Sequence, residues 1–264
     1  MGTAVRPTLS IVVPVFNEER RLPAMLDALR AHGKLVAEDA NLTLVEVVAV
    51  DDGSTDSTPE LLARASGLPA PLRVVRLPKN TGKGAAVRAG MLSATGEIAL
   101  MTDVDLSTPL DELRRLMSFI DDGADVAIGS RALAASQIVV HQPAHRELMG
   151  KTFNLLLRLA AGIPWRDTQC GFKLFRLDRA HRLFELQRID GFAFDAELLV
   201  RARRLGLDVA EVPVQWIDNP DSRVGLVGSS SRMAFDALRI AYWARARARR
   251  PPALVSSPQE SPRT

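Results

Sequence analysis

The sequence LVEVVAVDDGSTD, at residues 44–56, joins an apolar, β-branched run to a turn rich in acidic residues. The run Leu44–Val50 is typical of a buried strand. Gly53 permits a turn, and residues 54–56 can cap a following helix. A strand that passes through such a turn into a helix is the repeating unit of a parallel, helix-covered sheet.

The same unit recurs through the first half of the chain. Four further apolar runs are predicted strands: Ser10–Val15, Leu72–Leu77, Glu97–Met101 and Asp125–Gly129. Helical spacing connects them, in Leu22, Leu26 and Leu29 and again in Leu113, Leu116, Met117 and Ile120. The chain is therefore expected to have an α/β fold with a mainly parallel central sheet flanked by helices.

The second half is less regular. It predicts a helix from about His145 to Ala161, a strand Phe172–Arg176, a helix Asp195–Leu205 and a strand Val209–Trp216. We expect one catalytic domain over residues 1–225 and a basic amphipathic helix over residues 226–250. Residues 251–264 are rich in Pro and Ser and are expected to be disordered, because they bury too little apolar surface to offset their ordering entropy.

The cysteine content and the hydropathy pattern indicate where in the cell the protein acts. The single cysteine, Cys170, excludes an internal disulfide, and the N-terminal residues do not have the pattern of a secretion signal. The apolar stretch Thr152–Ile163 is interrupted by Arg158 and is shorter than the roughly 20 residues of a spanning helix. The expected location is the cytoplasm, with peripheral association with the cytoplasmic face of a membrane.

The triplet Asp103-Val104-Asp105 follows one of the predicted strands. Side chains two residues apart in an extended segment share a face, so both carboxylates can converge on one ion. Such a pair suits Mg²⁺ or Mn²⁺, which also binds diphosphate oxygens. The acidic pair Asp51-Asp52 follows another strand, and ligands of open parallel sheets bind at this edge. Each motif taken alone is also compatible with an ordinary loop.

The segment LPKNTGKGAAVRAG, residues 77–90, combines glycine with positive charge. Gly82 and Gly84 are expected to open a helix, and Lys79, Lys83 and Arg88 lie near its phosphate-attracting N-terminus. A helix start that merely contains glycine is the alternative.

The whole array of motifs is more specific than any member. VVPVFNEE, VDDGSTD, NTGKGAAV, DVDLS, IGSR, DTQCGFKLF and AFDAELL, read together, resemble the family 2 glycosyltransferases. Over about residues 9–225 the spacing is most similar to dolichyl-phosphate β-glucosyltransferases and slightly less similar to dolichyl-phosphate mannose synthases. The resemblance implies a GT-A fold, an inverting reaction and a UDP- or GDP-sugar donor.

The resemblance also implies roles for the donor-binding residues. Pro14, Phe16 and Glu18 would line the nucleotide pocket, and Asp51 and Asp52 would address base and ribose. Phe16 stands where a tyrosine is commoner, so one hydroxyl is lost.

The metal is assigned to the acidic triplet. Asp103 and Asp105 would bracket ribose and metal, with Asp105 the more direct ligand, and Val104 and Lys83 would complete the donor site. The metal would neutralise charge on the departing nucleoside diphosphate.

Four residues are candidates for the reacting side of the site. Arg131 and Arg223 match positions that place cations near phosphates, and the alternative for both is a solvated surface. Asp167 and Asp195 are candidate bases or orienting groups. The alternatives are a loop hydrogen bond for Asp167 and a helix cap for Asp195.

The expected reaction is transfer of a sugar, glucose first, from a UDP-sugar to dolichyl or polyprenyl phosphate. GDP-mannose as donor and a non-lipid acceptor are the alternatives. Residues 232–250 contain six arginines among aromatic and aliphatic side chains, which indicates a helix on an anionic membrane surface; a membrane-protein partner is also possible. Nucleic-acid binding is disfavoured because it leaves the acidic motifs unexplained. A noncatalytic sensor is disfavoured because Asp103 and Asp105 are intact.

Overall fold

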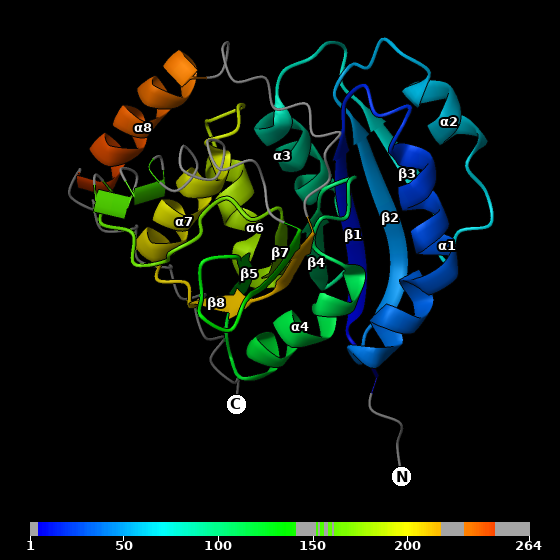
Figure 1. Cartoon of the computed structure of the whole chain (residues 1–264), viewed down its shortest axis with the longest axis horizontal. Helices are drawn as coiled ribbons and strands as arrows, with labels where there is room; N and C mark the ends of the chain where they lie inside the picture. The colour runs from blue at the N-terminus through cyan, green and yellow to red at the C-terminus, as the bar shows by residue number, and fades with distance from the viewer. Residues whose placement is uncertain are drawn as a thin grey trace, which may run out of the picture.

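The computed structural model describes residues 5–140, 161–217 and 230–245, together with positions 152, 154, 155, 158 and 159. Its centre is a seven-stranded sheet in the order β3-β2-β1-β4-β7-β5-β8 (Figure 1). The strands are β1 (Thr8–Val15), β2 (Thr43–Asp51), β3 (Leu72–Arg76), β4 (Ile98–Thr102), β5 (Val126–Ser130), β7 (Phe172–Arg176) and β8 (Val209–Pro213).

The sheet is mainly parallel, as predicted. The exception is β7, which lies between β4 and β5 and runs antiparallel to both. The single strand expected over Val209–Trp216 is instead two short strands. β8 ends at Pro213, which has no amide hydrogen, and β9 (Gln215–Ile217) leaves the main sheet to pair with β6 (Gln137–Val140).

Helices cover both faces of the sheet and make three layers (Figure 1). On one face lie α1 (Leu22–Asp39), α2 (Thr58–Arg64), the 3₁₀ turn η1 (Leu110–Glu112) and α4 (Leu113–Asp121). On the other lie α3 (Lys83–Ser93), α6 (Leu177–Leu186) and α7 (Phe194–Leu205), with α8 (Ser230–Arg245) packed outside α7.

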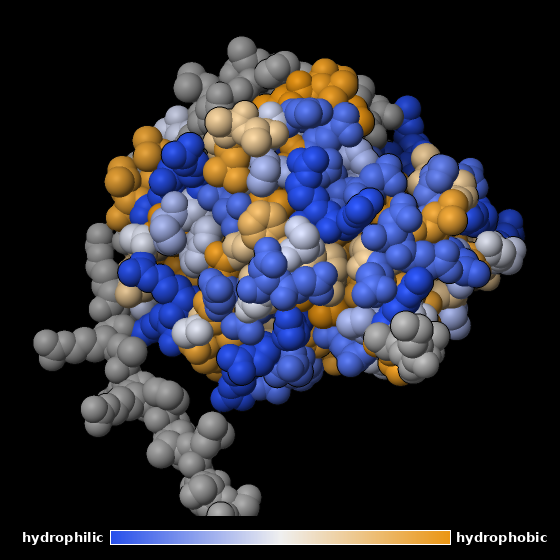
Figure 2. All heavy atoms as spheres, turned by 90° about the horizontal axis from the view of Figure 1, so that it is seen from below, coloured by the Kyte–Doolittle hydropathy of each residue, from blue (hydrophilic) through white to orange (hydrophobic). Residues whose placement is uncertain are grey.

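Successive side chains of β1 point to opposite faces of the sheet, so β1 contributes to both hydrophobic cores. Ile11 and Val13 pack with α1 and α4, whereas Val12 packs with α3 on the opposite face. Figure 2 shows the molecule from below relative to the view of Figure 1. On this face hydrophilic side chains cover much of the surface, and apolar ones form small patches among them.

The loops after β1 and β2 are joined to each other. The Asn17 amide, in a left-handed conformation with φ 53°, donates to Ser54 Oγ at 2.9 Å, and the Thr55 amide donates to Asn17 Oδ1 at 2.9 Å. The Glu18 amide donates to Thr58 Oγ1 at 2.8 Å. Two segments 37 to 40 residues apart in sequence are thereby fixed at the carboxyl edge of the sheet.

The remaining predicted segments are described in part. The positions described between residues 152 and 161 are helical, in agreement with the helix expected over about His145–Ala161, whose other residues lie outside the described part. Of the helix expected over residues 226–250, residues 230–245 form α8, and residues 226–229 and 246–250 lie outside the described part. The tail 251–264 lies outside the described residues. Among the helices that the structure describes, none combines the length and apolar character needed to cross a bilayer.

Candidate active site

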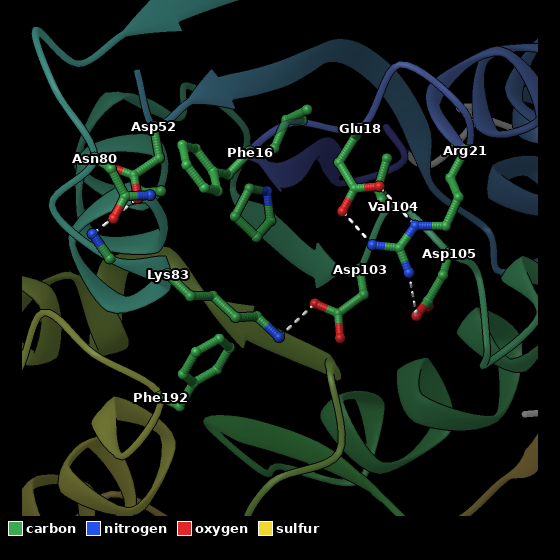
Figure 3. Close-up of a pocket in the computed structure, with 14 residues that line it drawn as sticks. Phe16, Glu18, Arg21, Asp52, Asn80, Lys83, Asp103, Val104, Asp105 and Phe192 are labelled. Atoms are coloured by element: carbon green, nitrogen blue, oxygen red, sulfur yellow. Dashed lines mark hydrogen bonds and ion pairs between the residues drawn. The ribbon is translucent and has the colours of Figure 1, made fainter. Parts of the chain in front are cut away.

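A cavity of about 410 Å³ opens at the carboxyl edge of the sheet (Figure 3). The ends of β1, β2 and β4 and the start of α3 supply most of its wall. Its lining residues are Pro14, Val15, Phe16, Glu18, Arg21, Asp52, Asn80, Gly82, Lys83, Ala86, Asp103, Val104, Asp105 and Phe192. The structure thus brings together eight residues that the sequence assigned to donor or metal: Pro14, Phe16, Glu18, Asp52, Lys83, Asp103, Val104 and Asp105.

One end of the cavity is partly aromatic. Phe16 and Phe192 are 40% and 41% exposed, although both are large apolar side chains. They come from segments far apart in the sequence and both line the cavity, as Figure 3 shows. Exposed aromatic faces inside a cavity suit a planar or apolar ligand group.

Asp52 organises the loop that leads into α3. Its carboxylate accepts hydrogen bonds from the amides of Thr81 and Gly82, each at 2.8 Å, and from Asn80 Nδ2 at 3.1 Å. Burial raises the pKa of Asp52, and the hydrogen bonds from Thr81 and Gly82 oppose that shift. The Thr81 and Gly82 amides are therefore already bonded to a carboxylate, and the positive charge that α3 offers to a phosphate is chiefly that of Lys83.

Asp51 occupies a different environment from Asp52. It is 0% exposed and accepts a hydrogen bond from the Ser54 amide at 2.8 Å, and Arg76 Nε lies 3.2 Å from its carboxylate. It does not line the cavity, so of the two aspartates expected at base and ribose only Asp52 is brought there.

The other end of the cavity is charged. Lys83 Nζ lies 2.6 Å from Asp103 Oδ1, and Arg21 Nη1 lies 3.7 Å from Asp105 Oδ2. Arg21 is held by Glu18, to which its Nε donates at 2.6 Å and its Nη2 donates a second bond (Figure 3).

Both cations keep their protons firmly. Burial alone would lower the pKa of Arg21, but Glu18 and then Asp105 and Asp103 raise it. For Lys83 burial also acts downward, and Asp103 is the largest of the charges that raise the pKa.

Arg21 lines the cavity but was not predicted from the sequence. Its signal was present in NEERR at residues 17–21, because a residue three after Glu18, at a helix start, returns to the same side of the turn. Glu18 O accepts from the Leu22 amide at 2.8 Å, which closes that turn.

The acidic triplet fits a metal ion that is shared with a ligand. Within the described part of the chain, no group of three or more His, Cys, Asp or Glu side chains forms a metal cage. Asp103 and Asp105 supply two hard oxygen donors, so further positions would come from ligand oxygens and water, which is the usual arrangement for Mg²⁺ on phosphates. Gly171 leaves room for Asp103, because a Cβ at residue 171 would lie 2.0 Å from Asp103 Oδ2.

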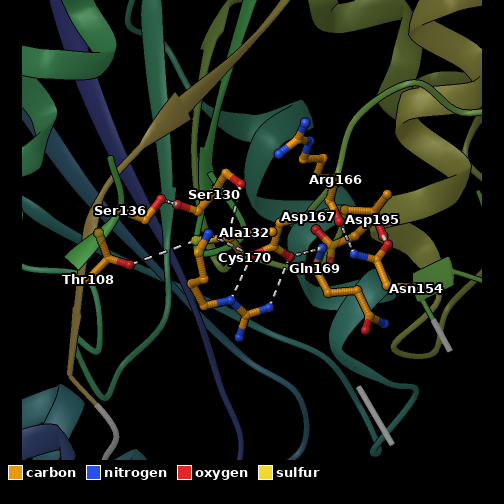
Figure 4. Close-up of polar contacts among 12 residues, drawn as sticks. Thr108, Ser130, Ala132, Ser136, Asn154, Arg166, Asp167, Gln169, Cys170 and Asp195 are labelled. Carbon is orange, nitrogen blue, oxygen red and sulfur yellow. Dashed lines mark hydrogen bonds and ion pairs between the residues drawn. The ribbon is translucent and has the colours of Figure 1, made fainter. Parts of the chain in front are cut away.

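Arg131 and Asp167 form a fixed pair outside the cavity wall. Figure 4 shows Asp167 among its polar neighbours, beside Gln169 and Cys170. Arg131 Nε donates to Asp167 Oδ2 at 2.7 Å, its Nη2 donates to Oδ1 at 3.0 Å, and its amide donates to Oδ2 at 3.0 Å. Its guanidinium lies 5.5 Å from the ring centroid of Trp216. Burial acts to raise the pKa of Asp167, but Arg131 outweighs it and lowers the pKa to about 2. Asp167 is therefore held ionised by Arg131.

Asp195 is buried in a second pair. Its Oδ1 accepts from Lys173 Nζ, which also donates to Cys170 O at 2.6 Å, and the two side chains are 5% and 1% exposed. Asp195 does not cap α7, since the N-cap position is Ala193 and no side-chain cap bond is formed there. Arg223, the remaining candidate, lies outside the described residues.

Phe192 reaches the cavity because the loop between α6 and α7 packs against the start of α3. Gln187 Nε2 donates to Gly84 O at 2.8 Å, and Glu197 accepts from the Ile189 amide at 2.7 Å. A Cβ on Gly82 would lie 2.3 Å from Asp190 O, so glycine is required at this contact. No sequence motif signals this position, because it depends on two distant segments meeting.

Comparison with known proteins agrees with this geometry. The sequence profile described as Glycosyl transferase family 2 matches residues 10–184. A dolichyl-phosphate beta-glucosyltransferase of Trichomonas vaginalis is 37% identical over 243 residues, which cover 90% of this chain and 72% of that protein. The Homo sapiens protein of the same name is 36% identical and covers 88% of this chain and 74% of its own length.

Solved structures with the same fold include a glucosyl-3-phosphoglycerate synthase from Mycobacterium tuberculosis, in complex with Mn²⁺, UDP-glucose and phosphoglyceric acid. Its TM-score is 0.64 at 20% identity, with coverage of 89% of this chain and 80% of that one. A mannosyltransferase from Pyrobaculum calidifontis, in complex with GDP-mannose and Mn²⁺, gives a TM-score of 0.54 at 20% identity and covers 84% and 59%.

Proposed function

The chain belongs to glycosyltransferase family 2, and we propose that it transfers glucose from UDP-glucose to dolichyl or polyprenyl phosphate, with inversion at the anomeric carbon. The observation that carries the donor assignment is the single cavity wall that joins aromatic side chains at one end to the Asp103-Asp105 pair at the other. A nucleoside diphosphate sugar has the same order of parts: a flat base, then an anionic diphosphate.

The donor is proposed to lie along that wall. Phe16 and Pro14 pack against the base, and Asp52 and Asn80 lie at the same end of the cavity. The diphosphate then lies between Lys83 and Arg21, whose positive charges favour it. Mg²⁺ or Mn²⁺ held by Asp103 and Asp105 neutralises charge on the leaving nucleoside diphosphate.

The acceptor is proposed to be a lipid monophosphate, in line with the names of the most similar relatives. Its phosphate is anionic at neutral pH, so the reaction needs little help from a base. Asp167 and Asp195 act in this proposal as orienting groups, since each is already bound to a cation, Arg131 and Lys173 respectively. Arg223 is proposed to supply positive charge toward the incoming phosphate, whereas the charge of Arg131 is already balanced by Asp167.

We propose that the chain acts at the cytoplasmic face of a membrane, in peripheral contact with it, since a lipid acceptor must be reached at a membrane surface. Leu238 and Tyr242 are 70% and 71% exposed and lie four residues apart on α8, so they share one face of that helix. Large apolar side chains on an exposed helix in an arginine-rich segment suit the surface of anionic lipid. A membrane-protein partner on the same face is the alternative occupant.

The test is transfer of radiolabelled sugar to a polyprenyl phosphate by the purified chain with Mn²⁺ or Mg²⁺. UDP-glucose, UDP-N-acetylhexosamines and GDP-mannose are compared, and Asp105→Ala is the control. We expect a metal-dependent lipid product from UDP-glucose that Asp105→Ala does not form. If only GDP-mannose gave a product, GDP-mannose and not UDP-glucose would be the donor. If the chain bound nucleotide sugar but formed no lipid product, the lipid acceptor would be wrong and a soluble acceptor would take its place.

A further inference from the structure

The guanidinium of Arg21 faces Asp105, a carboxylate proposed to bind the metal ion, rather than solvent. Glu18 accepts hydrogen bonds from two nitrogens of Arg21, Nε and Nη2, and so orients the guanidinium. The third nitrogen, Nη1, faces Asp105 Oδ2 at 3.7 Å. The side chains of Arg21, Glu18 and Asp105 are only 15%, 12% and 17% exposed, so solvent screens this contact weakly.

The second carboxylate has its own cation. Lys83 Nζ lies 2.6 Å from Asp103 Oδ1, and their side chains are 22% and 33% exposed. Each side chain of the pair proposed to bind metal is therefore already next to a positive charge supplied by the chain itself.

The charges at this end of the cavity almost balance. Glu18, Asp103 and Asp105 are negative, and Arg21 and Lys83 are positive, which leaves one negative charge. A divalent cation alone would leave an excess of one positive charge, in contact with two cations. A nucleoside diphosphate sugar, which carries two negative charges, restores the original balance when it enters with the cation.

We propose that Arg21, oriented by Glu18, makes binding of the divalent cation depend on the nucleoside diphosphate. This inference rests on the proposed function, because it takes a metal and a nucleotide sugar as the ligands of this cavity. Arg21 repels a cation that arrives alone and attracts the diphosphate that arrives with it. By linkage, the factor by which nucleotide tightens metal binding equals the factor by which metal tightens nucleotide binding.

A purely structural role for Arg21 makes a different prediction. The Glu18–Arg21 pair also stabilises the start of α1, where the Leu22 amide donates to Glu18 O. If that were its whole role, replacing Arg21 would lower stability but leave the ratio of metal affinities with and without nucleotide unchanged.

The experiment measures Mn²⁺ binding to the full chain, with and without saturating UDP, by the electron paramagnetic resonance signal of free Mn²⁺. UDP binding with and without Mn²⁺ is measured by calorimetry. The variants are Arg21→Met, which removes the charge, and Arg21→Lys, which keeps the charge but loses the fork that binds Glu18. Arg20→Met is the matched control, because it removes one charge from the exposed neighbouring residue.

We expect Arg21→Met to bind Mn²⁺ about tenfold more tightly than the unchanged chain when UDP is absent, after allowance for solvent screening. The mutual enhancement of Mn²⁺ and UDP should fall by a similar factor in both measurements. The Mn²⁺ affinities of Arg21→Lys and Arg20→Met without UDP should stay within about threefold of that of the unchanged chain. Both variants keep a positive charge at residue 21, which lines the cavity.

The outcomes separate the two proposals. If the unchanged chain shows the enhancement and Arg21→Met shows it undiminished, the inference about Arg21 is overturned while the proposed function stands. If the unchanged chain binds no UDP with Mn²⁺, the proposed function falls, and the inference falls with it. Thermal unfolding identifies a misfolded variant, in which case Arg21→Gln, which keeps a polar side chain, takes the place of Arg21→Met.

Discussion

The backbone at Gly171 lies directly against the carboxylate of Asp103, so that a Cβ there would be 2.5 Å from Asp103 Cγ. Gly171 immediately precedes β7, and Phe172 pairs with Thr102 at the end of β4. The antiparallel strand thus brings the CGF segment, residues 170–172, beside the acidic triplet, residues 103–105. The position of a proposed metal ligand therefore depends on a residue nearly 70 positions later in the chain.

Replacement of Gly171 by alanine should displace Asp103. We expect kcat/KM for sugar transfer to fall by about 100-fold, because a displacement of about 1 Å at a reacting centre has effects of this size. Thermal unfolding should change little, since the atoms in conflict belong to a side chain at the cavity wall. Gly191→Ala is the control, because the nearest atom to a Cβ there is 3.9 Å away. Full activity in Gly171→Ala would show that Asp103 has no fixed position in catalysis.

The Arg131–Asp167 pair should make stability depend on acid. Asp167 has a pKa of about 2 in the folded chain, below its ordinary value of 3.8, so its contribution is complete above about pH 4 and is lost as the pH falls toward 2. Asp167→Asn should lower the free energy of unfolding by about 2 kcal/mol at pH 7.

Urea denaturation at pH 7 and pH 3 checks this expectation. The difference between the two proteins should shrink at the lower pH, because Asp167 is then increasingly protonated in the unfolded chain. Asp178→Asn, at an exposed position, should change stability by less than about 0.5 kcal/mol. An equal deficit at both pH values would mean that the charge of Asp167 is not the cause.

The buried Lys173–Asp195 pair should fail when one partner is removed. Lys173→Met leaves the Asp195 carboxylate buried without its ammonium, and we expect a loss of about 3 to 5 kcal/mol in the free energy of unfolding. The double variant Lys173→Met, Asp195→Asn removes both charges and should recover a large part of that loss. Chemical denaturation of the three proteins gives the comparison. A double variant less stable than Lys173→Met would show that the pair is not the source of the effect.

Phe16 should contribute to donor binding by its ring rather than by a polar group. Phe16→Ala should raise the KM for the sugar donor about tenfold, since an aromatic contact of this kind contributes about 0.5 to 1.5 kcal/mol beyond its buried area. Phe16→Tyr, which restores the commoner residue, should stay close to the unchanged chain. Steady-state kinetics with varied donor provides the test, and an unchanged KM in Phe16→Ala would place the base elsewhere.

The layered α/β fold and the edge at which the site lies could both be predicted from the sequence. Apolar β-branched runs and leucine spacing are local patterns, and they specify strands and helices wherever they occur. Parallel strands end at the same edge, so Asp52 and Asp105 could be assigned to one edge of the sheet without any structure. Phe16 was assigned to the same site only by the resemblance of its motif to the family 2 glycosyltransferases.

Which of the candidate side chains meet depends on how the elements pack together. This packing buried Asp51 away from the cavity, brought Phe192 into it and set Arg21 beside Asp105. It also inserted β7 between β4 and β5, and so placed Gly171 against Asp103. Such contacts depend on the pairing of strands and the packing of loops that are distant in sequence, and local periodicity carries no information about either.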